Sequence, residues 1–200
     1  MLKPVLRAAT LLCLFLVLAA APALVARAVD ISTVGADDGP PLAQWGGGFE
    51  FRRRIATVDN PYCDITTDVV SDYPQQATSA MDPKGHPSIF VDRQIVQTDL
   101  PYAHFLMAHE CCHHTLGHVR LTSARLGQVG PQPFYYIRPL LKGMELDADK
   151  CAVRMLKFTK EPDAIEIARQ RMLSFGSKPT GAHYPTGIER ADAMARSASE

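Results

Sequence analysis

The sequence has no excess of charge of either sign and no internal repeat. Lys plus Arg and Asp plus Glu each total 21 among 200 residues, so the formal net charge is zero. Proteins that bind nucleic acid carry an excess or a stripe of basic residues, so the composition predicts no nucleic-acid partner. Hydrophobic residues make up 46% of the chain, which excludes a disordered protein, and the length fits one compact domain.

Only one long apolar run is present, and it lies near the N-terminus. Lys3 and Arg7 precede the run, which covers Ala8–Ala21 and is shorter than the ~20 residues that a membrane-spanning helix needs. Ala26–Ala28 then has the small-residue pattern of a signal-peptidase site. Residues 1–28 are therefore predicted to be a signal peptide, and the protein is expected to be exported, to the periplasm or outside the cell. A retained N-terminal membrane anchor is the alternative; after signal cleavage no stretch remains that could span a bilayer.

Four of the five cysteines follow the predicted signal peptide, namely Cys63, Cys111, Cys112 and Cys151. An even number of cysteines in an exported protein predicts two disulfides. A bond between the adjacent Cys111 and Cys112 would form a strained ring. Each is therefore expected to pair with either Cys63 or Cys151, and the sequence leaves both connectivities open.

The rest of the chain divides into a short leader and one domain. Residues 29–48 are rich in Gly, Pro, Asp and Ala and predict a flexible leader, and residues 49–200 are expected to form the domain. Phe51, Ile55 and Val58 recur at helical spacing and predict a short helix, whereas Ser88–Val91 predicts a strand.

Helix signals dominate the remainder of the domain. Apolar spacing, capping residues and Pro/Gly punctuation predict helices over about 102–119, 143–158 and 162–176, and a fourth from the capping-box pair Thr186 and Glu189. The predicted fold is therefore α+β, mostly helical, with a short edge strand or small sheet beside the first of these helices.

The first of these helices carries the strongest chemical signal, an HExxH motif at His109–His113. Residues four apart lie ~40° apart around a helix, so both imidazoles are expected to reach one metal ion. Glu110 lies one step round the helix, where it can reach a metal-activated water. This arrangement predicts metal-assisted hydrolysis, with Glu110 taking a proton from the water and passing it to the leaving amine.

A catalytic zinc needs a third protein ligand, and Glu145 is the best candidate. It begins a predicted helix, and Asp149 lies one turn further on the same face, where it can accept a hydrogen bond from a ligand imidazole and fix its tautomer. Taken alone, these carboxylates equally fit an acidic helix N-terminus. The expected cofactor is one Zn²⁺ per chain. His114 and His118 would point roughly 140–180° away from His109 on a continuous helix and are expected in supporting or surface positions.

The motifs together resemble the gluzincin-type zinc metallopeptidases that include the heat-shock protease HtpX and the CAAX prenyl proteases. Four segments match in order along about residues 80–195: His86–Val91, His109–His118, Glu145–Ala152 and Ala182–Arg190. The resemblance implies a zincin-like domain with His109, His113 and Glu145 as metal ligands. It further implies that His183 or Arg190 stabilises the oxyanion.

The same resemblance implies a substrate site beside the motif helix. The strand at Ile89, Phe90 and Val91 is expected to pair with the backbone of an extended peptide or unfolded-protein substrate. The sequence thus predicts an exported zinc metalloendopeptidase, acting in protein quality control. Two other interpretations remain: a zinc-stabilised binding or chaperone-like protein that does not cleave, and a disulfide-held structural domain with an accidental motif.

Overall fold

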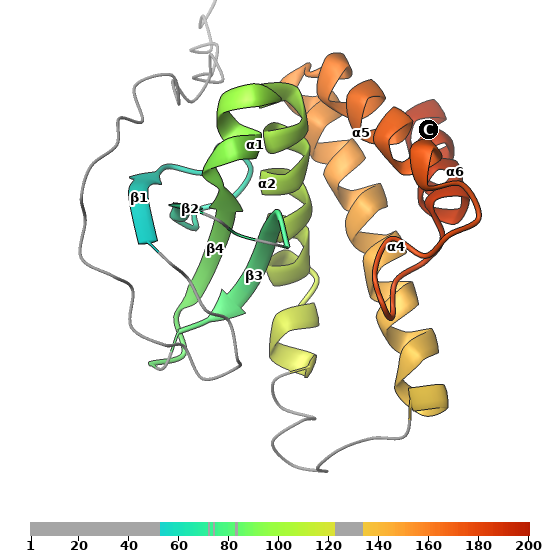
Figure 1. Ribbon diagram of the computed structural model, residues 1–200, viewed down its shortest axis with the longest axis horizontal. Helices are drawn as coiled ribbons and strands as arrows, with labels where there is room; N and C mark the ends of the chain where they lie inside the picture. Colours follow the sequence, from blue (N-terminus) through green and yellow to red (C-terminus); the bar gives the residue numbers. More distant parts are fainter. Residues whose placement is uncertain (1–52, 72, 74, 83, 123–133) are drawn as a thin grey trace, which may run out of the picture.

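The computed structural model describes residues 53–71, 73, 75–82, 84–122 and 134–200, so the predicted signal peptide and leader lie outside the described residues. The domain is mixed α+β, as predicted (Figure 1). The strands are β1 (Arg53–Val58), β2 (Thr67–Ser71), β3 (Ala77–Met81) and β4 (Pro87–Asp92). The helices are α1 (Arg93–Thr98), α2 (Leu100–Thr115), α4 (Phe134–Thr159), α5 (Pro162–Phe175) and α6 (Gly187–Ser199). Within these ranges no helix has the length and hydrophobicity needed to cross a membrane.

The four strands form one sheet in the order β1-β2-β4-β3. β2 and β4 are parallel, and the two outer strands are antiparallel to their neighbours. Side chains alternate between the faces of a strand, so Ile89 and Val91 join the main core with α2, whereas Phe90 packs on the opposite face with Val70 and Tyr73. The interior strand β4 is accordingly buried on both faces.

The helix predicted from Phe51, Ile55 and Val58 is wrong, because Arg53–Val58 forms β1; Phe51 itself lies outside the described residues. Ile55, Thr57 and Val58 are β-branched residues, which fit a half-buried sheet. β1 pairs with β2 along its length, with one register shift between Arg54 and Ala56. Pairing with a partner strand therefore overrides a helical spacing that rested on three positions.

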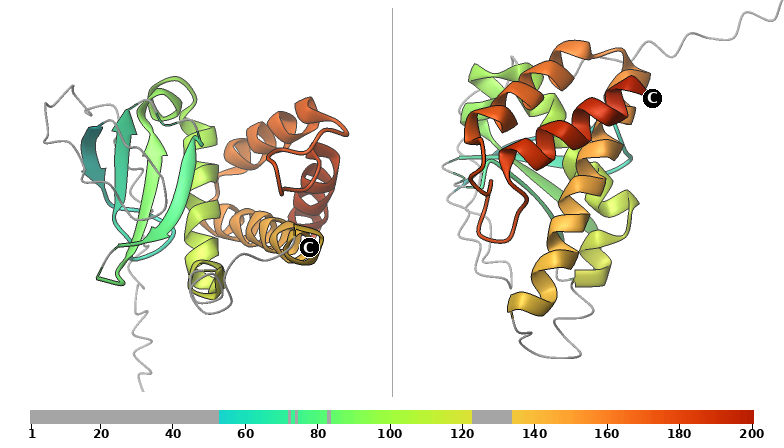
Figure 2. Two further views of the ribbon diagram at one scale, coloured as in Figure 1. Left: turned by 60° about the horizontal axis from the view of Figure 1, so that its bottom comes forward. Right: turned by 90° about the vertical axis from the view of Figure 1, so that its right-hand side faces the viewer.

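Helix α2 lies between the sheet and the three C-terminal helices (Figures 1 and 2). Asp99 caps its N-terminus by accepting a hydrogen bond from the Tyr102 backbone N–H, and Pro101 occupies the first turn. Because α2 has neighbours on several sides, nearly every residue from Tyr102 to Cys112 is buried. The HExxH motif is therefore carried by the central element of the domain.

The C-terminal helices start and end close to the predicted boundaries, except that α4 begins nine residues before the predicted Gly143. Thr186 and Glu189 form the predicted capping box at the start of α6. A side chain at Gly187 would place its Cβ 2.0 Å from the Met172 carbonyl oxygen, so glycine allows α6 to approach α5 closely. This close packing positions Arg190, one turn further on, against α4.

Candidate metal centre

The structure brings the three predicted ligands together. His109 and His113 extend from α2, and Glu145 extends from the facing helix α4. The two Nε2 atoms lie 3.1 Å apart, and each lies 3.4 Å from an oxygen of the Glu145 carboxylate. Within the described part of the chain, this is the one cluster of His, Cys, Asp and Glu side chains that could hold a metal ion.

These separations match the spacing of ligands around a single ion. Atoms that each lie about 2.0–2.1 Å from a tetrahedrally coordinated ion are about 3.3 Å from one another. His109 and Glu145 are buried, and His113 is only slightly exposed. A buried set of two imidazoles and a carboxylate at this spacing could bind a cation with no large rearrangement of the chain.

Behind the ligands, Asp149 and Arg190 support His109. Asp149 Oδ1 lies 3.0 Å from His109 Nδ1, in the position predicted for it. The Arg190 guanidinium donates two hydrogen bonds to Asp149, at 2.6 and 2.7 Å, and both side chains are buried. This pairing holds the pKa of Asp149 at about 2, because the charges of Arg190 and His109 outweigh the effect of burial. The geometry engages Arg190 in this ion pair, and its role at an oxyanion stays a prediction.

Glu110 lies beside the ligand cluster and faces the sheet. Ser79 of β3 donates its hydroxyl and its backbone N–H to the Glu110 carboxylate. Burial, reinforced by the charge of Glu145, raises the pKa of Glu110 above its ordinary value. A carboxylate with a raised pKa close to a metal site is suited to receive and return a proton.

The two ligand imidazoles have opposite pKa shifts. Burial disfavours charge on His109, but hydrogen bonds to Asp149 and Glu145 outweigh it and raise its pKa to about 10. Burial and the positive charge of His109 lower the pKa of His113 to about 3. In the metal-free protein at neutral pH, His109 is therefore charged and donates to the neutral His113.

This difference predicts proton release on metal binding. A metal ion must displace the proton from His109 Nε2, so at pH 7 one proton should leave for each Zn²⁺ bound, and the apparent affinity should rise about tenfold per pH unit between pH 6 and 8. Affinity rises with pH because the pKa of His109 in the metal-free protein is about 10, so a lower pH favours protonated His109 over the metal-bound form. Titration calorimetry in buffers of different ionisation enthalpy measures the protons released, and an affinity that is independent of pH would contradict the prediction.

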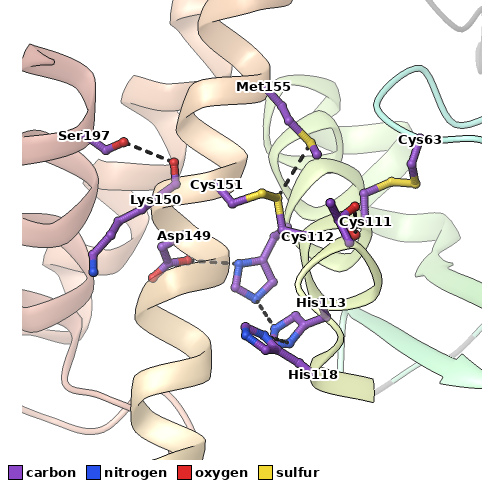
Figure 3. The surroundings of a disulfide bond; sticks show 12 residues. Cys63, Cys111, Cys112, His113, His118, Asp149, Lys150, Cys151, Met155 and Ser197 are labelled. Carbon is purple, nitrogen blue, oxygen red and sulfur yellow. Dashed lines mark hydrogen bonds and ion pairs between the residues drawn. A yellow bond between two sulfur atoms is a disulfide. The ribbon is translucent and has the colours of Figure 1, made fainter. Parts of the chain in front are cut away.

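Two disulfides hold the motif helix on different sides (Figure 3). Cys63–Cys111 ties α2 to the connection between β1 and β2, and Cys112–Cys151 ties α2 to α4. Both disulfides were expected, and the structure selects between the two connectivities that the sequence left open. The second disulfide joins the helix of His109 and His113 to the helix of Glu145.

Removing each disulfide should lower stability similarly but affect the metal site differently. The bonds close loops of 48 and 39 residues, which corresponds to about 4 kcal/mol each in the loop-entropy description. Replacing Cys112 and Cys151 by serine should also weaken Zn²⁺ binding, because the ligand helices lose their link. The double variant with Cys63→Ser and Cys111→Ser is the matched control. We expect it to lose the same free energy of unfolding in urea, while its Zn²⁺ affinity stays nearly unchanged. Equal affinity losses in the two double variants would contradict this prediction.

The strand predicted to pair with a substrate lies in the wrong place for that role. Ile89, Phe90 and Val91 belong to β4, which is paired with β2 on one side and β3 on the other. No backbone edge of β4 remains for a peptide, so this prediction is wrong. Among the described residues, β3 is the outermost strand on this side of the sheet, with no strand paired at its outer edge, and Ser79 places it next to Glu110.

Three residues of the site were not assigned a specific role from the sequence. They are Ser79, His118 and Tyr184. Tyr184 lies in the connection between α5 and α6 and is 41% exposed, but desolvation of its phenol and the charges of Glu145 and Glu110 raise its pKa. The neighbouring His183 is partly buried, and its role at an oxyanion stays a prediction. The only sequence signal for Tyr184 is its position between His183 and Pro185.

No family model, no curated protein and no solved structure matches this chain. The function of the site is therefore inferred from its donor atoms, their spacing and their burial. These properties define a buried site with two nitrogen donors, one carboxylate donor and an acid–base group beside it.

Proposed function

We propose that the protein is a zinc metalloendopeptidase related to the gluzincin-type enzymes. The observation that carries this proposal is the convergence of His109, His113 and Glu145 from two helices, with the buried Glu110 beside them. Glu110 is not needed for metal binding, and its position matches that of a general base. A metal site that only stabilised the fold would not need a buried carboxylate such as Glu110 beside its ligands.

The donor set favours zinc over the common hard cations. Ca²⁺ and Mg²⁺ prefer six or more oxygen ligands, whereas two imidazoles and one carboxylate are a frequent catalytic zinc set with a fourth position left for water or substrate. The ligand separations of 3.1–3.4 Å agree with tetrahedral coordination. One Zn²⁺ per chain is therefore the proposed cofactor.

The residues around the ligands have distinct tasks in peptide hydrolysis. Bound zinc supplies Lewis-acid activation of a water molecule and of the scissile carbonyl. Glu110 accepts a proton from the attacking water and delivers it to the leaving amine. Tyr184 has its phenol within electrostatic range of Glu110 and Glu145, and its O–H is the candidate donor to the developing oxyanion. Asp149 keeps the His109 ring oriented and its Nε2 available as a ligand.

The free edge of β3 is the proposed binding site for the substrate backbone. In an antiparallel pair, successive residues alternate between facing the partner strand and facing away from it. The Ser79 backbone N–H faces away from β4, toward Glu110. An extended peptide added at this edge would lie beside the proposed base and be held by main-chain groups of β3 other than the Ser79 N–H, which bonds Glu110. Such binding selects little for sequence and suits peptides or unfolded proteins.

The disulfides support the proposed location. Disulfides persist in oxidising compartments, and the structure contains two. Together with the predicted signal peptide, they support an exported enzyme that acts on unfolded proteins in the periplasm or outside the cell.

Hydrolysis by the metal-loaded protein tests the proposed function. The oxidised protein, loaded with one equivalent of Zn²⁺, is expected to cleave unfolded casein, to lose activity with 1,10-phenanthroline and to regain it when Zn²⁺ is restored. Binding of one Zn²⁺ without any cleavage would contradict the peptidase proposal and support the non-cleaving binding protein. Failure to bind Zn²⁺ would remove both.

A further inference from the structure

The C-terminal end of α2 brings a third imidazole to the ligand pair. The Nδ1 atoms of His118 and His113 lie 3.2 Å apart, and the two rings meet edge to face with centroids 5.1 Å apart. Figure 3 shows these rings side by side. The direction expected for His118, well away from His109, is therefore wrong, whereas a supporting position was one of the two positions expected for it.

The reason is a break in the helix. On a continuous helix, residues five apart lie about 140° apart and do not meet. Here α2 ends at Thr115, and Gly117 adopts φ +74, a left-handed conformation that glycine tolerates well. A new helical stretch starts at 118, with the Leu121 N–H bonded to the Gly117 carbonyl. The turn breaks the helical repeat and brings His118 to His113.

The proton positions on these rings follow from the geometry. His113 Nε2 belongs to the ligand cluster, so it must present a lone pair to bind a metal ion. The proton of a neutral His113 then lies on Nδ1, facing His118 Nδ1 at 3.2 Å. A hydrogen bond between two nitrogens needs one donor and one acceptor, so His118 Nδ1 accepts.

We propose that His118 is a positioning residue for the metal site, because its Nδ1 accepts a hydrogen bond from His113 Nδ1 and thereby fixes the tautomer in which His113 Nε2 is a ligand. Each ligand imidazole thus has its own supporting acceptor: Asp149 for His109 and His118 for His113. Groups of this kind commonly change metal affinity by about 10–100-fold when they are removed. The inference rests on the proposed metal site and does not depend on hydrolysis.

Three variants of His118 separate the hydrogen bond from ring packing. His118→Phe keeps a ring but lacks an acceptor, and His118→Ala lacks both. His118→Asn places a carbonyl oxygen close to the position of Nδ1. We expect Zn²⁺ affinity, measured by competition with a chromophoric chelator, to fall about 10–100-fold for Phe and Ala and to be largely retained for Asn. His114→Phe is the matched control, because His114 contacts the Ser88 carbonyl and not a ligand.

A second readout reports the hydrogen bond itself. In ¹⁵N-labelled, metal-free protein, a scalar coupling across the N–H···N bond should connect His113 Nδ1 with His118 Nδ1, and it should vanish in His118→Phe. Absence of this coupling in the wild type, or wild-type affinity in His118→Phe, would overturn the inference. Should the wild type fail to bind Zn²⁺, the proposed function fails, while the coupling still decides the role of His118.

Discussion

Replacing Glu110 by glutamine is expected to lower the rate of peptide hydrolysis by about 10²–10⁴-fold, the usual contribution of a general acid–base group. Glutamine has nearly the same shape and can still accept the hydrogen bonds from Ser79, but it cannot take a proton from water. Zn²⁺ should still bind at one ion per chain, because the proposed ligands His109, His113 and Glu145 are unchanged. Cleavage of a quenched fluorescent peptide measures the rate, and equilibrium dialysis measures the bound zinc.

The control for this variant is Glu166→Gln. Glu166 is exposed on α5 and pairs with Arg169, so its loss should leave both hydrolysis and zinc binding unchanged. Wild-type rates for Glu110→Gln would show that Glu110 is not the base, even if the protein is a peptidase. Loss of zinc from Glu110→Gln would instead show that the carboxylate belongs to the metal site.

Replacing Arg190 by methionine is expected to lower the free energy of unfolding by about 3 kcal/mol. Breaking a buried ion pair from one side typically costs about 3–5 kcal/mol, because the remaining charge stays buried. Asp149 is fully buried and would lose both hydrogen bonds from Arg190. The lower end of the range applies because His109 still faces Asp149. Urea unfolding of the metal-free protein at neutral pH measures the loss.

An exposed ion pair on α4 offers the matched control. Arg154 bonds Glu200 at 2.8 Å, but both side chains are more than 60% exposed, so Arg154→Met should leave the free energy of unfolding nearly unchanged. Similar losses for the two variants would mean that burial of the Arg190–Asp149 pair contributes nothing. Arg190→Met should also bind Zn²⁺ more weakly, since Asp149 no longer holds the His109 ring in place.

The ligand set could be predicted from the sequence because its signals are local. His109 and His113 share one turn of one helix, and Asp149 follows Glu145 by one turn of another, so helical periodicity alone brings each pair onto one face. The capping box at Thr186 and the strand at Ser88–Val91 are equally local features. Each depends on residues fewer than seven positions apart.

The sheet could not be predicted in the same way. β2 pairs in parallel with β4, where Thr67 lies opposite Ile89, and its pairing with β1 contains a register shift. Neither pairing leaves a local signal, and β1 even had helical spacing. The free edge was assigned to β4 because the sequence does not state which strand lies outermost. His118 was misplaced for a related reason: the break at Gly117 changes the direction of the chain, and periodicity assumes an unbroken helix.

The adjacent cysteines of the motif helix fix its rotation. Consecutive residues lie about 100° apart around a helix, so Cys111 reaches the β1–β2 connection while Cys112 reaches α4. The helix can neither turn about its axis nor slide along α4 without straining one of the two bonds. Covalent bonds, as well as packing, therefore set the direction in which His109 and His113 point.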